Sequence, residues 1–99
     1  MIVEFDAALW QWEARRSDAW TFVSLPTDVA DDILDAVSVQ RGFGSVRVEA
    51  SVGSTTWRTS VFPSAEQRTF VLPVKRAVRR AEGVDVGDTL EVRLRVLDA

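Results

Sequence analysis

The chain repeats one pattern: a strand that ends in Leu-Pro, a short helix, and a further strand. The first copy begins at Thr21–Pro26 (TFVSLP) and the second at Thr69–Pro73 (TFVLP), with one extra serine in the first. Val46-Arg47-Val48 starts 20 residues after Pro26, and Val92-Arg93-Leu94 starts 19 residues after Pro73. Proline suits both the end of a strand and the start of a helix, because its missing N–H costs little there. We therefore expect a duplicated unit; the alternative is that two strand ends adopted Leu-Pro for local reasons.

Strands are expected wherever apolar and polar residues alternate or β-branched and aromatic residues gather. These stretches are Ile2–Glu13, Trp20–Leu25, Val46–Val52, Thr55–Phe62, Arg68–Leu72 and Leu90–Val96. The first stretch changes phase near Ala8, so Trp10 and Trp12 fall on the face opposite Val3 and Phe5 unless a bulge resets the register. Gly53-Ser54 predicts a tight turn, which makes the two strands that flank it antiparallel.

Two short helices are expected, one opened by Pro26 and one opened by Pro73. The first is acidic, with Ser24 or Thr27 as its cap, and its core-facing residues are expected to be Val29, Ile33 and Val37. The second is basic and should stop at Gly83. Its buried stripe is predicted to be Val74, Ala77, Val78 and Ala81, and its solvent face Lys75, Arg76, Arg79 and Arg80. Between the first helix and Val46, the stretch from Ser38 to Gly44 reads as a loop.

These elements predict a mainly β domain with two short helices. Its 99 residues are enough for one compact core, and no linker divides them. Each half, about 1–52 and 53–99, reads strand, strand, helix, strand. Six strands of this length suit a small closed barrel with pseudo-twofold symmetry, since closure protects strand edges.

The absence of cysteine and histidine narrows the possible chemistry. Disulfides, thiolate nucleophiles, imidazole bases and the commonest transition-metal ligands are all missing, so we expect no metal, no cofactor and no enzyme activity. A formal net charge of −3 disfavours general nucleic-acid binding. The N-terminus lacks the features of a signal peptide, and no apolar run approaches a membrane span, so a soluble cytoplasmic location is expected.

Two stretches supply the candidate ligand-binding residues, which are Arg58, Thr59, Ser60, Lys75, Arg76 and Arg79. If Arg58 points into a cleft beside Lys75, the two cations can hold a carboxylate or a phosphate. The alternative is an outward Arg58 paired across strands with Glu49. Likewise, the basic helix can be an anion-binding surface or simply a solvated face whose charge suits the helix C-terminus.

Four tryptophans are many for this length: Trp10, Trp12, Trp20 and Trp57. We expect them in the core, because large aromatic side chains dominate the cores of small domains. The alternative is that one or two of them line an apolar pocket or an interface.

Two resemblances to known families follow from the motifs. Leu72-Pro73, a short helix, Gly83 and then Gly87-Asp88 are similar to the swapped-hairpin AbrB-like domains, whose dimers form a double-split β-barrel. A closer resemblance, to the bacterial family called domain of unknown function 1905, covers nearly the whole chain. It rests on Leu9-Trp10, Trp20–Pro26, Gly42–Val46, Trp57–Pro63 and Leu72–Arg79. It implies a double-split β-barrel and no established biochemical activity, and the family is sometimes fused to a domain related to bacteriocin-protection proteins.

Together these arguments predict an uncharacterised, non-enzymatic binding module for a small anionic ligand or a protein partner, more readily a monomer than an obligate oligomer. A DNA-binding regulator is the alternative, by analogy with the AbrB-like fold. That alternative requires a contiguous basic face, which the arginines would have to form: Arg47, Arg68, Arg79, Arg93 and Arg95.

Overall fold

The computed structural model describes residues 1–12, 20–37 and 44–97, so Glu13–Ala19 and most of the loop expected at 38–44, including Phe43, lie outside the described residues. The described part contains seven strands and two helices. The strands are β1 (Ile2–Ala8), β2 (Trp10–Trp12), β3 (Trp20–Ser24), β4 (Val46–Val52), β5 (Thr55–Ser64), β6 (Thr69–Pro73) and β7 (Thr89–Val96). The helices are α1 (Thr27–Ala36) and α2 (Arg76–Glu82).

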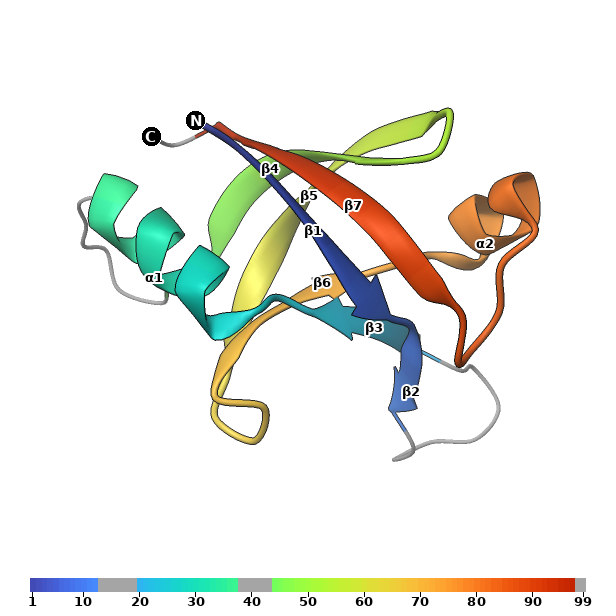
Figure 1. The fold of residues 1–99 in the computed structure, drawn as a ribbon, viewed down its shortest axis with the longest axis horizontal. Helices are drawn as coiled ribbons and strands as arrows, with labels where there is room; N and C mark the ends of the chain where they lie inside the picture. Colours follow the sequence, from blue (N-terminus) through green and yellow to red (C-terminus); the bar gives the residue numbers. More distant parts are fainter. Residues whose placement is uncertain (13–19, 38–43, 98–99) are drawn as a thin grey trace.

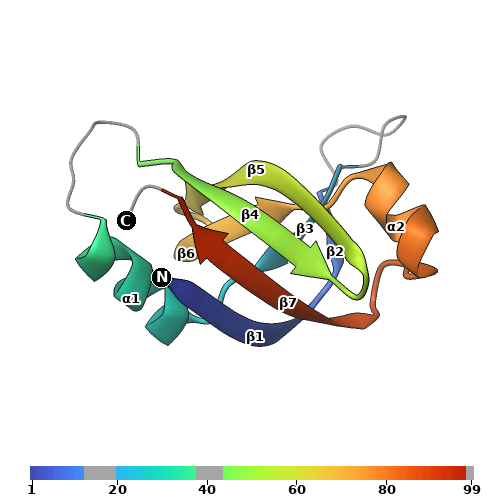
Figure 2. The same cartoon turned by 90° about the horizontal axis from the view of Figure 1, so that it is seen from above.

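All seven strands belong to one sheet with the order β1-β7-β4-β5-β6-β3-β2. Every neighbouring pair is antiparallel. The sheet curls into a half-barrel, with α1 at one end and α2 at the other (Figures 1 and 2). The expected mainly β architecture with two helices is therefore confirmed.

The first strand is interrupted at Leu9. This break divides it into β1 and β2, so the sheet has seven strands where six were expected. Leu9 is buried, its N–H donates to Asp88 O (2.9 Å), and its carbonyl accepts from Gly87 N (2.8 Å). On one side of the break β1 pairs with β7, and on the other side β2 pairs with β3. The phase change read near Ala8 thus marks a change of strand partner, not a bulge in one continuous strand.

The strand pairing has an approximate twofold symmetry: each pair of strands has a counterpart in which the strands of one half are replaced by those of the other half. The β2–β3 pair corresponds to β5–β6, because β1 and β2 together take the place of β5. The β1–β7 pair corresponds to β4–β5. The β3–β6 and β4–β7 pairs each join equivalent strands of the two halves.

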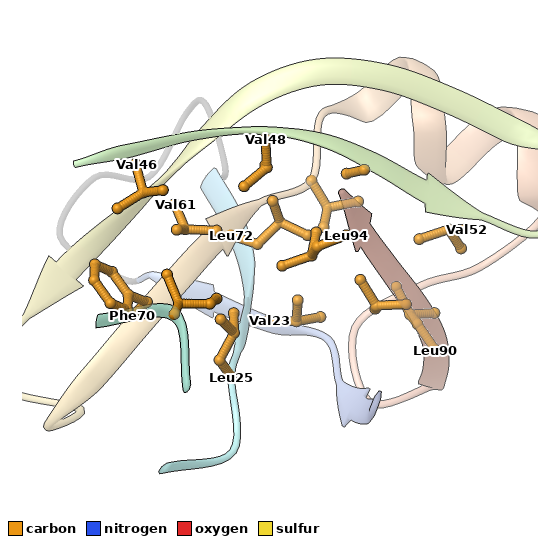
Figure 3. Packing of buried hydrophobic residues seen from close by; sticks show 14 of the residues in the cluster. Val23, Leu25, Val46, Val48, Val52, Val61, Phe70, Leu72, Leu90 and Leu94 are labelled. Carbon is orange, nitrogen blue, oxygen red and sulfur yellow. The ribbon is translucent and has the colours of Figure 1, made fainter. Parts of the chain in front are cut away.

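The core lies on the concave side of the sheet (Figure 3). β4 and β7 bury every second residue, as their alternating sequences predict. Val23, Val48, Val61, Leu72 and Leu94 are completely buried. Thr21 is the buried polar residue of the described chain, and its hydroxyl donates to Val74 O (2.6 Å).

α1 packs Ala30 and Ile33 into the core, and Val29 and Val37 are partly buried against it. Its N-cap residue is Pro26, and no side chain caps it. The expected cap by Ser24 or Thr27 is therefore wrong.

α2 begins at Arg76, because Pro73 is still the last residue of β6. The prediction that Pro73 opens this helix is wrong. Its buried residue is Val78, while Ala77 and Ala81 are exposed, which corrects the predicted stripe. Gly83 ends the helix with φ 65°, as expected. Neither described helix has the length and apolarity needed to span a membrane.

The turns at the two ends of β5 each contain a residue with positive φ. Gly53-Ser54 joins β4 to β5, with Gly53 at φ +59°, and the carboxylate of Glu82 accepts a hydrogen bond from Thr55 Oγ1 beside this turn. Arg68, in the turn from β5 to β6, has φ 59°. At the other end of β7, Val96 N–H donates to Met1 O (2.9 Å), so the start of β1 lies beside the end of β7 (Figure 1).

Candidate binding face

The six candidate ligand-binding residues do not share one face. Arg58 and Ser60 lie on the convex side of β5, whereas Thr59 alternates to the concave side. The β5–β6 ladder begins at Phe62↔Val71, so no strand pairing joins Arg58 to Lys75. Lys75 and Arg76 are exposed at the start of α2, and Arg79 is half-buried.

Arg58 is directed outward. Its side chain is 69% exposed, and its Nε lies 3.7 Å from Glu49 Oε2. Glu49 also pairs with Arg95, across the next strand, at 3.4 Å. This arrangement matches the cross-strand pair that the sequence left as the alternative to a cleft.

Two buried donors near α2 were not anticipated from the sequence. Trp57 Nε1 and Arg79 Nε are inaccessible to solvent, and neither has a hydrogen-bond acceptor among the described residues. Trp57 is on the concave side of β5 and packs against the core, and α2 packs against the same strand. A buried N–H without an acceptor is unfavourable, so each of these two donors is an unsatisfied hydrogen-bonding group in the interior.

The convex side of β2, β3, β6 and β5 carries a group of aromatic side chains, which we call the aromatic face. It consists of Trp10, Trp12, Trp20, Phe22 and Phe62. The register places them together, since Trp10 is opposite Phe22 and Trp12 is opposite Trp20. Cross-strand partners project from the same side of a sheet.

Three members of the aromatic face are strongly exposed: Trp12 (48%), Trp20 (56%) and Phe62 (43%). The expectation of a core position is therefore wrong for Trp12 and Trp20, and also for Trp10, which is half-buried on the same convex side. Trp57 is the one tryptophan that packs against the core cluster. The cause is the alternation of the strands, which continues through Leu9 and places Trp10 and Trp12 on the side opposite Val3 and Phe5. The pairing with β3 places Trp20 on the same convex side as Trp12.

Ring contacts and hydrogen bonds hold the aromatic face together. The ring of Phe22 lies between two indoles, with its centroid 5.2 Å from that of Trp10 and 6.3 Å from that of Trp20. Trp10 Nε1 donates to Ser24 Oγ (2.9 Å), and Ser24 Oγ donates to Gln67 Oε1 (3.1 Å). Val71, on the same side of the sheet, is buried without belonging to the main core. The face is thus partly preorganised before any partner binds.

Cations border this face at its α2 end. Val74 N–H donates to Thr21 O (2.9 Å), so the pairing of β3 with β6 continues one residue beyond Pro73. Extended by one more residue, the same register puts Lys75 at the position opposite Trp20, the first residue of β3. Arg76 and Arg80 follow on α2, and both are exposed.

An open groove of about 680 Å³ crosses the convex side of β1, β7 and β4. Arg93 in this groove pairs with Glu4 at 3.7 Å, and the carboxylates of Asp6 and Glu91, at opposite positions of β1 and β7, also line it. The hydroxyl groups of Ser51 and Thr56 are hydrogen-bonded to each other. In the described ranges, no group of three or more acidic side chains is placed to hold a metal ion.

The arginines required for a DNA-binding face are dispersed. Arg93 and Arg95 lie on β7 and pair with Glu4 and Glu49. Arg68 is in the β5–β6 turn and Arg79 is on α2. Arg47 lies on β4, on the same convex side as Arg93 and Arg95. Because Arg68 and Arg79 are on separate elements, the five arginines do not form one contiguous basic surface within the part of the chain that the structure describes.

Comparison with protein families matches residues 5–94 to the model described as Domain of unknown function (DUF1905). The match begins within β1 and ends within β7, so it includes the aromatic face and both helices. No curated protein matches the chain.

Proposed function

The chain belongs to the DUF1905 family, and from that premise we propose that it is a non-enzymatic module that binds a protein partner through its aromatic face. One observation carries the proposal. Trp12, Trp20 and Phe62 are each more than two-fifths exposed on a single side of the sheet. Exposed aromatic side chains that gather in one patch are typical of protein interfaces, where tryptophan is among the residues that contribute most to affinity.

The border of the face indicates the chemistry of the partner. Lys75 and Arg76 favour a segment that carries acidic side chains next to its apolar ones. Trp10 and Phe22 are already in ring contact, so little side-chain freedom is lost when such a segment binds. The proposed ligand is therefore a peptide segment that combines aliphatic or aromatic residues with Asp or Glu.

A displayed peptide library tests this function. Selection on the wild-type chain, with counter-selection on Trp12→Ser/Trp20→Ser, should enrich peptides with this composition. Their affinity for Trp20→Ser should fall at least about tenfold, as for loss of an interface hot spot. Val86→Ser is the matched control, because Val86 is 44% exposed but lies in the loop that precedes β7. Equal binding to wild type and to the double variant would rule out the aromatic face as the site.

We also infer that the curled sheet is a double-split barrel made of two copies of one unit. The support is the pairing pattern, which is unchanged when the halves are exchanged once β1 and β2 are counted as one strand bent at Leu9. On this interpretation the six expected strands correspond to the seven observed ones, because β1 and β2 together are the first expected strand.

A second candidate function is the binding of a small anion at the base of α2. It is favoured by the two buried donors without acceptors, Trp57 Nε1 and Arg79 Nε. Titration of labelled protein with inorganic phosphate and with citrate, followed by two-dimensional NMR, tests it. Saturable shifts of the Trp57 indole N–H and the Arg79 Nε–H would support the site, and unchanged signals with both anions would exclude it.

A further inference from the structure

The two helices carry opposite charge at opposite ends of the molecule. α1 contains Asp28, Asp31, Asp32 and Asp35 and no basic residue. α2 and its N-cap residue contain Lys75, Arg76, Arg79 and Arg80. The helices lie at the two ends of the longest axis (Figures 1 and 2), and the molecule extends 35 Å along that axis. One copy therefore cannot bring its own α1 against its own α2.

α1 also exposes an apolar side chain among its carboxylates. Leu34 is 59% exposed, more than any other large hydrophobic residue in the described ranges. Asp31 is three residues before Leu34 and is its neighbour on the helix surface, and Asp35, four residues after Asp31, is in turn the neighbour of Asp31. This combination of one aliphatic side chain and flanking acids is the chemistry that the aromatic face and its cationic border were argued to accept.

We propose that the occupant of the aromatic face is α1 of a second copy of this chain. Leu34 then packs against Trp20, while Asp31 and Asp35 approach Lys75 and Arg76. The inference rests on the proposed function, since it assigns a partner to the same face. The contact joins two different surfaces, so it is heterologous: one copy of the pair keeps a free α1 and the other keeps a free aromatic face. Association therefore continues beyond the dimer, into open chains or closed rings, and it increases with protein concentration and decreases with salt.

Two variants, each lacking one half of the contact, test the proposal. Leu34→Ser/Asp35→Lys removes the α1 half, and Trp20→Ser/Lys75→Glu removes the aromatic half. In sedimentation velocity at about 1 mM protein and about 20 mM salt, where screening is weak, each variant alone should be a monomer. An equimolar mixture should form heterodimers and nothing larger, because each variant retains one complementary surface. The wild-type chain should form larger species under the same conditions, and these should dissociate at about 300 mM salt.

The control is Asp6→Lys/Glu91→Lys, which makes two acid-to-lysine changes on β1 and β7, away from α1. It should associate like the wild-type chain. A wild-type chain that stays monomeric at low salt would overturn the proposal, and so would association that survives Leu34→Ser/Asp35→Lys. The peptide-display experiment separates this failure from failure of the proposed function. Leu34→Ser/Asp35→Lys keeps its aromatic face, and it should bind the selected peptides whether or not copies associate.

Discussion

The hydroxyl of Thr21 donates a hydrogen bond of 2.6 Å to the backbone carbonyl of Val74, which lies between β6 and α2. A related bond runs between the halves in the other direction, from Thr69 Oγ1 to Leu25 O (2.9 Å) just before α1. In each half of the chain, a threonine hydroxyl therefore donates to the backbone just before the helix of the other half. Thr21 is also the first residue of the first repeated motif and Thr69 of the second, so the repeat carries these contacts.

Replacement of Thr21 by Val should destabilise the fold. The substitution keeps the shape but leaves the buried carbonyl of Val74 without this donor, which costs about 1–2 kcal/mol. Urea unfolding followed by tryptophan fluorescence measures the difference. Thr21→Ser should retain most of the stability, and Thr56→Val serves as the control because Thr56 is exposed. A Thr21→Val variant as stable as the wild-type chain would show that this bond contributes nothing.

Gly53→Ala should destabilise the β4–β5 turn for two reasons. The residue has φ +59°, and a Cβ there would overlap the carboxylate of Glu82, which is held by Thr55. We expect a loss of about 1–3 kcal/mol in the free energy of unfolding. In a Glu82→Ala background the overlap is gone and only the backbone strain remains, so the effect of Gly53→Ala should be smaller. Strictly additive losses in the double-mutant cycle would contradict this coupling.

Arg68→Gly should stabilise the protein. Arg68 has φ 59°, a left-handed conformation that costs a residue with a Cβ about 1–2 kcal/mol. Glycine removes that cost, but it loses more backbone entropy on folding than arginine does. The free energy of unfolding is therefore expected to rise by only about 0.5 kcal/mol. Thermal unfolding measures the gain, and Arg68→Ala controls for loss of the side chain. If both variants melt alike, the turn is not strained at this position.

Trp20→Ser should separate binding from stability. The Trp20 side chain is 56% exposed, so its loss should change the free energy of unfolding by less than about 1 kcal/mol. Leu72→Ala, at a completely buried position, should cost about 2–5 kcal/mol. Denaturant unfolding of both variants gives the comparison. A large loss with Trp20→Ser would mean that the aromatic face is a second core rather than a surface for a partner.

Asp6→Lys should stabilise the β1–β7 pair slightly. Asp6 lies directly opposite Glu91 on the convex side, and like charges at such positions repel. A change to opposite charges should contribute a few tenths of a kcal/mol, and the gain should shrink in high salt. Unfolding at two salt concentrations checks both statements. A gain that is the same in low and high salt would point to a cause other than the charge pair.

Most of the fold could be predicted from the sequence, because the alternation of apolar and polar residues within a strand shows which of its residues are buried. The alternation in Val46–Val52 and in the strand that ends at Val96 can be read without knowledge of the neighbouring strands, and it is confirmed. The break at Leu9 could be located only as a phase change. Its cause is the backbone of Gly87 and Asp88, far away in the chain, so no local pattern could identify it.

The candidate site was harder to predict for a related reason. Alternation gives the side of a strand on which a residue lies, but not what covers that side. Trp12 and Trp20 were assigned to the core because of their size, yet alternation and their pairing put both on the convex side, away from the core. For Arg58, sequence reasoning supplied both alternatives, and the register with Glu49 decided between them. The buried donors of Trp57 and Arg79 depend on how α2 packs, which no sequence motif records.

The hydrogen bond from Val96 to Met1 has a topological consequence. The start of β1 and the end of β7 lie side by side, so a short flexible linker could join them without crossing the domain. New termini could then be opened at the exposed Gly53-Ser54 turn, which would place the second half of the chain before the first. Such a circular permutant should keep the strand order of the sheet, because each strand would retain the same neighbours whichever half of the chain comes first.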